Sequence, residues 1–214
     1  GLKTMRELFQ GKAVEFPPGK VGLEIGKLPV TLYASVEGPL GLRAAGRFAD
    51  GVILGSGFDL RVLQWAKEKI AQGAAEAGRA PEAIDLLAAG MICVDKDGDR
   101  ARATVRSRLA NRAHHNFRFT LETVPPEELP CLKAFMDHFD MSKPLEEKVD
   151  PSFVTDYLVR RFSIAGTPEE CVARVKELEQ AGLSRLLLTP PERIYTEMME
   201  AWSKEIMPHF QGAH

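Results

Sequence analysis

The sequence has few of the features that mark several large classes of protein. Its three cysteines, Cys93, Cys131 and Cys171, lie far apart in apolar or helical contexts. They favour buried thiols in a reducing compartment over disulfides or a metal site. No apolar run approaches the roughly 20 residues of a membrane span, and residues 1–12 lack the apolar core of a signal peptide. We therefore expect a cytoplasmic protein.

An excess of charge of one sign is also missing. The 28 Lys and Arg residues are scattered and nearly balance the 30 Asp and Glu residues, which gives a formal net charge of −2 at pH 7. This balance argues against a nucleic-acid surface. A hydrophobic share of 44% in 214 residues is typical of a globular domain, so we expect residues 1–214 to form a single domain.

What the sequence has is an alternation of strand and helix patterns, clearest over residues 29–56. Residues 30–34 are rich in β-branched and aromatic types and predict a buried strand. Residues 37–39 break it, and residues 52–54 form the next apolar run. The apolar residues between the two runs follow helical spacing: Leu40, Leu42, Ala45 and Phe48. Two buried strands joined by a crossover helix make a βαβ unit.

The alternation continues along most of the chain. Residues 13–28, rich in Gly and Pro, interrupt it and predict a surface excursion with a two-stranded flap. Thr167 and Glu170 predict a capping box at the start of a late helix. Further helices are expected at residues 2–10, 60–77, 100–113 and 194–206, the last burying Met198, Met199 and Trp202, and further strands at residues 84–94 and 185–188. This order indicates a parallel α/β sheet or barrel.

Two motifs that look like metal sites fail on inspection. Residues 95–99 resemble a calcium loop, but the glycine is misplaced and Arg106 stands where a bidentate Glu is required. A turn followed by a helix with Asp99 near its cap fits better. His114 and His115 point to different sides of a helix, which makes a poor metal pair. We therefore expect no metal, and a role for these histidines in lining a pocket stays open.

Residues 117–162 predict an insertion of helical pieces broken by prolines. It is too long for a simple connection, and long segments of this kind often cover active sites. Its aromatic residues are expected to form a small core of their own: Phe135, Phe139, Phe153 and Tyr157.

Five short motifs follow one another in order: Pro29–Ser35 with Glu37–Pro39, Ala49–Ile53, Ala77–Pro81, Gly166–Glu170 and Ala181–Leu183. Together they resemble the bacterial luciferase-like family of flavin- and deazaflavin-dependent oxidoreductases, which includes monooxygenases. The chain looks most similar to the branch that contains methylenetetrahydromethanopterin reductase and related enzymes that use coenzyme F420.

The resemblance implies a (β/α)₈ barrel and aligns this chain with its C-terminal half. The expected fold is an α/β partial (β/α)₈ TIM barrel, about strands 5–8 with a helical insertion before the last strand. The strand count agrees, because four core strands are predicted where a full barrel needs eight. A half-barrel leaves two open sheet edges, so we expect a homodimer or association with the missing half-barrel, in a truncated or natural form.

The resemblance also implies hydride transfer between F420 or FMN and a small organic substrate that enters beneath the insertion. Cofactor-binding loops carry over at Ala34, Ser35, Val36, Glu37, Gly38 and Pro39, and at Gly55, Ser56 and Gly57. Glycine lets backbone N–H groups approach a phosphate at the positive end of a helix, whereas a carboxylate in such a loop would repel phosphate unless it faces away.

Other interpretations stay open. The family's catalytic positions lie largely in the first four strands, so no catalytic residue is identified and the two adjacent histidines are guesses. The two loops could be no more than tight βα turns. The whole chain could be a non-catalytic half-barrel that serves as a binding or oligomerisation module.

Overall fold

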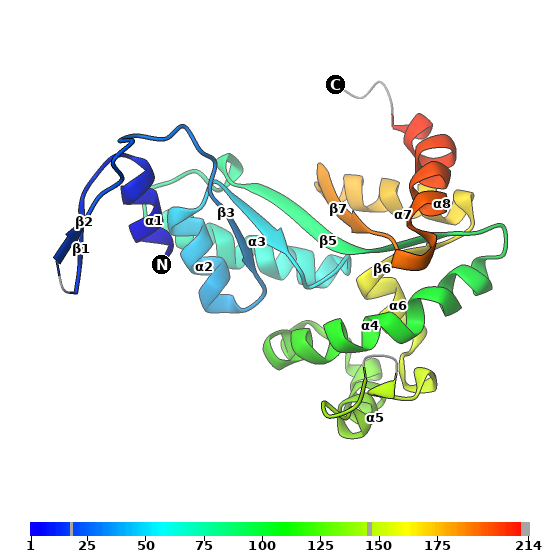
Figure 1. Ribbon diagram of the computed structural model, residues 1–214. Helices are drawn as coiled ribbons and strands as arrows, with labels where there is room; N and C mark the ends of the chain where they lie inside the picture. Colours follow the sequence, from blue (N-terminus) through cyan, green and yellow to red (C-terminus); the bar gives the residue numbers. More distant parts are fainter. Residues whose placement is uncertain (18, 145–146, 211–214) are drawn as a thin grey trace. The chain divides into compact units, whose positions relative to one another are not determined.

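The computed structural model describes residues 1–17, 19–144 and 147–210, so residues 145–146 of the predicted insertion lie outside the described part. Parallel strands alternate with helices along the chain, as expected for the predicted fold class (Figure 1). The chain divides into two compact units, which are described separately below. The first holds residues 1–54 and 65–87, and the second holds residues 55–64 and those from 88 onward. The single-domain expectation stays a prediction.

The first unit is built on two parallel strands, β3 (Tyr33–Val36) and β4 (Gly51–Leu54). They pair from Tyr33 opposite Gly51 to Val36 opposite Leu54, and α2 (Pro39–Phe48) is the crossover helix between them. Strand β3 begins later than the predicted strand of residues 30–34, because Val30 lies outside the pairing and is 46% exposed. Leu40 is 78% exposed, so the predicted apolar face of α2 is wrong at this residue.

The predicted flap is confirmed in the same unit. Helix α1 (Leu2–Phe9) precedes an antiparallel hairpin of β1 (Val14–Phe16) and β2 (Gly19–Val21). Arg6 connects α1 to the segment just before β4. Its Nε donates to the carbonyl of Phe48 at 2.5 Å, and its Nη2 donates to Asp50.

Helix α3 (Leu60–Glu76) packs against α2 at two glycines of the first unit. A Cβ at Gly46 would lie 2.1 Å from the carbonyl oxygen of Ile70, and one at Gly73 would lie 2.0 Å from that of Arg43. Neither position has room for a methyl group, so the two helices meet backbone to backbone. A short 3₁₀ turn (Pro81–Ala83) then leads to β5 (Asp85–Val94).

Strand β5 begins in the first unit and ends in the second. There Met91–Val94 pairs in parallel with β6 (Ser163–Gly166), and β7 (Arg185–Thr189) also pairs with β5. Strand β6 is absent from the sequence-based prediction. The unit's other elements are α4 (Gly98–Thr120), α5 (Leu129–His138), α6 (Asp156–Phe162), α7 (Pro168–Gln180), α8 (Tyr195–Ala201), a π-helical turn (Trp202–Ile206), and 3₁₀ turns Leu121–Thr123, Pro126–Glu128, Pro151–Phe153, Glu192–Ile194 and Met207–His209.

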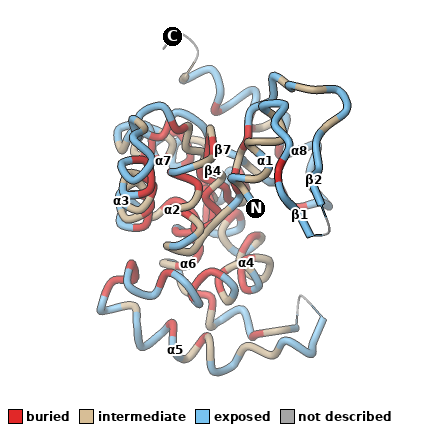
Figure 2. Tube along the Cα trace, turned by 90° about the vertical axis from the view of Figure 1, so that its left-hand side faces the viewer, coloured by how far each residue is buried: buried red, intermediate tan, exposed pale blue. Residues whose placement is uncertain are grey.

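The core of the second unit runs along α4 and into the insertion (Figure 2). Phe117 of α4, Phe135 of α5 and Phe162 of α6 are fully buried. The predicted aromatic residues do pack together, with Phe139, Phe153 and Tyr157 partly buried against this core. They do not form a small core of their own, because the same cluster continues into α4 and β5. Helix α4 continues to Thr120, so the start of the predicted insertion is the last turn of this helix.

Local predictions have mixed outcomes. Asp99 lies near the cap of α4, as predicted, in the first turn of the helix. The cap itself is Asp97, whose Oδ1 accepts from the backbone N–H groups of Asp99 and Arg100 at 3.0 and 3.2 Å. Met199 is 44% exposed, although Met198 and Trp202 are buried. Cys131 is exposed, whereas the other two thiols are buried. The capping box at Thr167 is confirmed.

Within the described residues, we find no helix that combines the length and the apolar character needed to cross a membrane.

Candidate functional site

The first predicted cofactor loop, residues 34–39, covers the end of β3 and the start of α2 in the first unit. Ala34 is buried, Ser35 is exposed, and the residues from Val36 to Pro39 are half-buried. Gly38 is the N-cap residue of α2, with φ −87° and ψ 159°, and Pro39 is the first helical residue. In the described part of the chain no side chain caps α2, and no acidic residue lies in its first turn.

Helices α3, α4 and α7, which also follow strands, begin differently. Asp59 Oδ1 accepts from the N–H groups of Arg61 and Val62 at 2.8 and 3.3 Å and so caps α3. Asp97 caps α4, and Thr167 with its capping-box partner caps α7. A helix N-terminus favours negative charge. An external anion at the start of α2 would therefore meet no competing carboxylate from a cap.

The second predicted loop, Gly55–Gly57, lies buried in the second unit. Asn116 Nδ2 donates to Ser56 Oγ at 2.9 Å, and Arg161 Nε donates to the Ser56 carbonyl at 3.3 Å. Gly57 has a φ of +88°, and a Cβ there would lie 2.1 Å from the carbonyl oxygen of Arg161. That carbonyl accepts from Phe58 N–H at 2.5 Å. The loop is thus held closely by residues from α4 and α6.

Arg161 is the centre of this arrangement and is only 1% exposed. Its Nη1 donates to Tyr157 Oη at 2.8 Å, and its Nη2 donates to Asn116 Oδ1 and Thr120 Oγ1 at 3.2 and 2.9 Å. Its guanidinium lies 4.8 Å from the ring centroid of Phe117. All of these acceptors are neutral, so the cation is satisfied by hydrogen bonds and aromatic faces. Burial raises the pKa of Tyr157, and the Arg161 guanidinium opposes this rise.

Sequence patterns alone did not indicate this network. The acceptors of Arg161 come from the loop after β4, from α4 and from α6, so no local spacing connects them. The two predicted loops belong to different units, and each is described by itself. Their role in holding a cofactor stays a prediction.

The adjacent histidines lie on α4 in aromatic surroundings. The His114 ring stacks on Phe139 with centroids 4.0 Å apart, and His115 meets Phe119 edge to face at 5.7 Å. Burial lowers the pKa of His114, and the positive charges of Arg118, His115 and Lys148 lower it further. Among the described residues no three His, Cys, Asp or Glu side chains gather in a way that could hold a metal ion.

Comparison with known proteins gives the family. The family model for luciferase-like monooxygenases matches residues 2–185, so this chain belongs to the luciferase-like monooxygenase family. A 5,10-methylenetetrahydromethanopterin reductase from Archaeoglobus fulgidus is 29% identical over 208 residues, which cover 89% of this chain and 58% of the relative. The F420-dependent glucose-6-phosphate dehydrogenase 1 of Rhodococcus jostii is 26% identical over 219 residues, which cover 99% of this chain and 59% of the relative.

Solved structures agree on the fold. The coenzyme F420-dependent tetrahydromethanopterin reductase of Methanopyrus kandleri aligns with a TM-score of 0.67 at 23% identity, covering 98% of this chain and 61% of that one. An F420-dependent secondary alcohol dehydrogenase aligns with a TM-score of 0.68 at 22% identity, covering 98% and 60%. The resemblance to the luciferase-like family and the predicted fold class are confirmed. The chain spans about three fifths of the length of these relatives.

Proposed function

We propose that this chain is part of an oxidoreductase that uses F420 or FMN and transfers a hydride between the cofactor and a small organic substrate. Membership of the luciferase-like family supports the reaction class. Relatives named for F420 support that cofactor, and a more distant solved monooxygenase, with a TM-score of 0.54, is in complex with FMN. The bound cofactor would supply the redox chemistry. The residues of this chain would bind and orient it.

The start of α2 is the observation that carries this proposal. It follows directly on the first predicted cofactor loop, and in the described residues it has neither a capping side chain nor an acid in its first turn. A phosphate placed there would accept from backbone N–H groups at the positive end of the helix. Gly38 has no side chain to block the approach. Gly55–Gly57 would add a second stretch of backbone whose position is fixed by Asn116 and Arg161.

The remaining part of the cofactor and substrate site would come from other chain segments. This chain spans 58% of the reductase from Archaeoglobus fulgidus. We infer that it corresponds to strands 5–8 of the family barrel. We propose that either a second copy or the missing half-barrel covers the open sheet edges. Analytical ultracentrifugation of the chain at micromolar concentration distinguishes self-association from a monomer, and a monomer would argue against the homodimer.

A fluorescence titration tests cofactor binding. We expect saturable quenching of F420 or FMN at roughly micromolar chain concentration. Ser35→Asp places a carboxylate beside the predicted phosphate position and should weaken binding about tenfold, because like charges a few ångströms apart near a surface repel by about 1–4 kcal/mol. Ser184→Asp is the matched control. Ser184 is exposed and lies just before the first residue of β7, whereas Ser35 lies near the last residue of β3. Equal affinity in the two variants would argue against a phosphate at the start of α2.

A second candidate function is a non-catalytic binding or oligomerisation module. The second loop favours it, because Gly55–Gly57 is buried and both the hydroxyl and the carbonyl of Ser56 already have protein partners. Tight self-association without quenching of either cofactor would support this candidate over the first.

A further inference from the structure

A single buried side-chain polar atom in the described residues has no hydrogen-bond partner, and it is Nε of Arg174 on α7. The Arg174 side chain is 8% exposed. Its Nη1 donates to Glu177 Oε2 at 2.6 Å, and its Nη2 donates to the Phe58 carbonyl at 2.7 Å. Burying a donor without a hydrogen-bond partner is unfavourable. An acceptor from outside the chain, such as water or an anion, would satisfy this donor.

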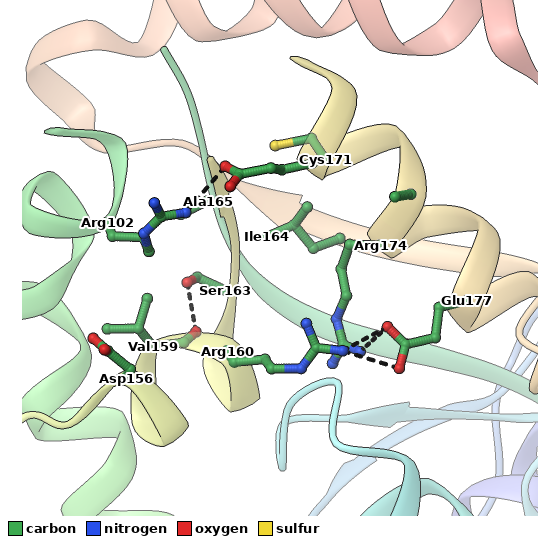
Figure 3. A pocket seen from close by; sticks show the side chains of 12 residues that line it. Arg102, Asp156, Val159, Arg160, Ser163, Ile164, Ala165, Cys171, Arg174 and Glu177 are labelled. Atoms are coloured by element: carbon green, nitrogen blue, oxygen red, sulfur yellow. Dashed lines mark hydrogen bonds and ion pairs between the residues drawn. The ribbon is translucent and has the colours of Figure 1, made fainter. Parts of the chain in front are cut away.

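Arg174 lines two cavities of the second unit, which have Arg160, Arg174 and Glu177 in common. We call the two cavities together the arginine groove. The larger measures about 580 Å³ and lies between α6, β6 and α7 (Figure 3). This volume is within the range of small-molecule sites. The smaller measures about 190 Å³ and reaches the start of α3.

The smaller cavity has an excess of positive charge. Four arginines line it against two carboxylates: Arg61, Arg160, Arg161, Arg174, Asp59 and Glu177. Both carboxylates are engaged, since Asp59 caps α3 and Glu177 accepts from Arg160 at 2.7 Å and from Arg174. Burial lowers the pKa of Arg174, Glu177 opposes this, and the positive charge of Arg160 lowers it again. An anion bound between Arg160 and Arg174 would reduce the repulsion between their two positive charges.

The larger cavity is balanced in charge and partly apolar. Arg102, Arg160 and Arg174 face an equal number of carboxylates there. Figure 3 shows Arg160 and Arg174 side by side near Glu177, and Ile164 and Val159 line the same cavity. Ala173 of α7 adds a small exposed side chain to the lining. The apolar part of this lining, which includes Val159, Ile164 and Ala173, suits an uncharged, apolar group of atoms.

We propose that the arginine groove binds a small amphipathic molecule that carries one oxyanion group, a carboxylate or a phosphate. The oxyanion lies in the smaller cavity, where it accepts from Nε of Arg174 and from the guanidinium of Arg160. The apolar body extends into the larger cavity along Val159, Ile164 and Ala173. None of the residues of the two predicted cofactor loops lines the groove.

Isothermal titration calorimetry on the full chain, without cofactor, tests the proposal. The probes are octanoate, octyl phosphate, octanol and inorganic phosphate. We expect at least one octyl anion to bind at least about tenfold more tightly than octanol and inorganic phosphate, because it alone has both the charge and the apolar body. The better of the two octyl anions identifies the oxyanion.

Variants locate the site. Arg160→Gln removes a charge from a side chain that is 62% exposed and should weaken the bound octyl anion about tenfold. Ala173→Phe fills the larger cavity and should abolish binding of the octyl anion. Arg100→Gln is the control, since Arg100 is 65% exposed on α4, pairs with Asp95 and lies outside the groove. Circular dichroism checks that each variant is folded.

Three results would overturn the proposal. One is the absence of binding of either octyl anion up to about 10 mM. Another is binding that Arg160→Gln and Ala173→Phe leave as strong as Arg100→Gln does. The last is inorganic phosphate or octanol that binds as tightly as the octyl anions, since the site would then recognise only one of the two features. None of these results depends on whether the chain binds F420 or FMN.

Discussion

Replacing Gly57 with Ala tests how tightly the insertion holds the second predicted cofactor loop. Gly57 has a φ of +88°, and a Cβ there would lie 2.1 Å from the Arg161 carbonyl oxygen. Gly78 is a matched control, because its φ is +64° but no atom lies within 4 Å of the position of its Cβ. Both substitutions force Ala into the left-handed region, and only the one at Gly57 also creates a collision.

The expected losses follow from these two contributions. The left-handed conformation costs about 1–2 kcal/mol for a residue with a Cβ, and both variants share this cost. At Gly57 the Arg161 carbonyl must also move away, which disturbs its hydrogen bond from Phe58 N–H. Leaving these buried groups without their partners adds a cost of about 1–3 kcal/mol, the size of one lost buried hydrogen bond. We therefore expect Gly57→Ala to lower the free energy of unfolding by about 2–5 kcal/mol and Gly78→Ala by about 1–2 kcal/mol.

Urea unfolding followed by circular dichroism measures both values. Limited proteolysis under native conditions adds local information, because a loosened loop should be cut near residue 57 in Gly57→Ala and not in Gly78→Ala. Equal losses of stability and equal cleavage patterns would refute the contact between the loop and Arg161.

Two further predictions concern titratable groups. In the native chain a thiol reagent at pH 8 should label the exposed Cys131 quickly and leave the buried Cys171 unmodified. Burial, followed by electrostatic interactions with Glu170 and Cys93, raises the pKa of Cys171 to about 12. Fast labelling of both cysteines, measured by mass spectrometry, would contradict this. Burial favours a higher pKa for Asp50, but hydrogen bonds from the backbone N–H of Leu32 and the Arg6 guanidinium outweigh it and lower the pKa below its usual value. The stabilising effect is therefore present above the ordinary carboxyl pKa and is lost as the pH falls through the lowered value. Asp50→Asn should be less stable than the unmodified chain at pH 7, with a difference that shrinks below about pH 4; a constant difference in urea midpoints would contradict it.

The sequence predicted elements whose signals are local. The crossover from β3 through α2 to β4 and the capping box of α7 depend on residues within one short segment, and the structure has both. Strand β6 was missed because its short run gains strand character only by pairing with Met91–Val94, which is far away in the sequence. Val30 shows the opposite case: its side-chain type favours β structure and predicts a strand, but pairing begins only at Tyr33.

The candidate site was harder to predict than the fold. The glycines of the two loops are visible in the sequence, and the family resemblance supplies their predicted role. The uncapped start of α2 follows from the absence of Ser, Thr, Asp and Asn at Gly38 and can be read from the sequence. The burial of Arg161 could not be read, because a cation enters a core only when distant segments supply its acceptors.

Hydrogen–deuterium exchange with and without cofactor tests the central claim most directly. With saturating F420 or FMN, we expect slower exchange in peptides that cover residues 34–42 and 55–58, because backbone N–H groups at the start of α2 and in the second loop would lie against the cofactor. Peptides from β1 and β2 should exchange as before. Cofactor binding with protection confined to other segments, or no binding at all, would contradict the account.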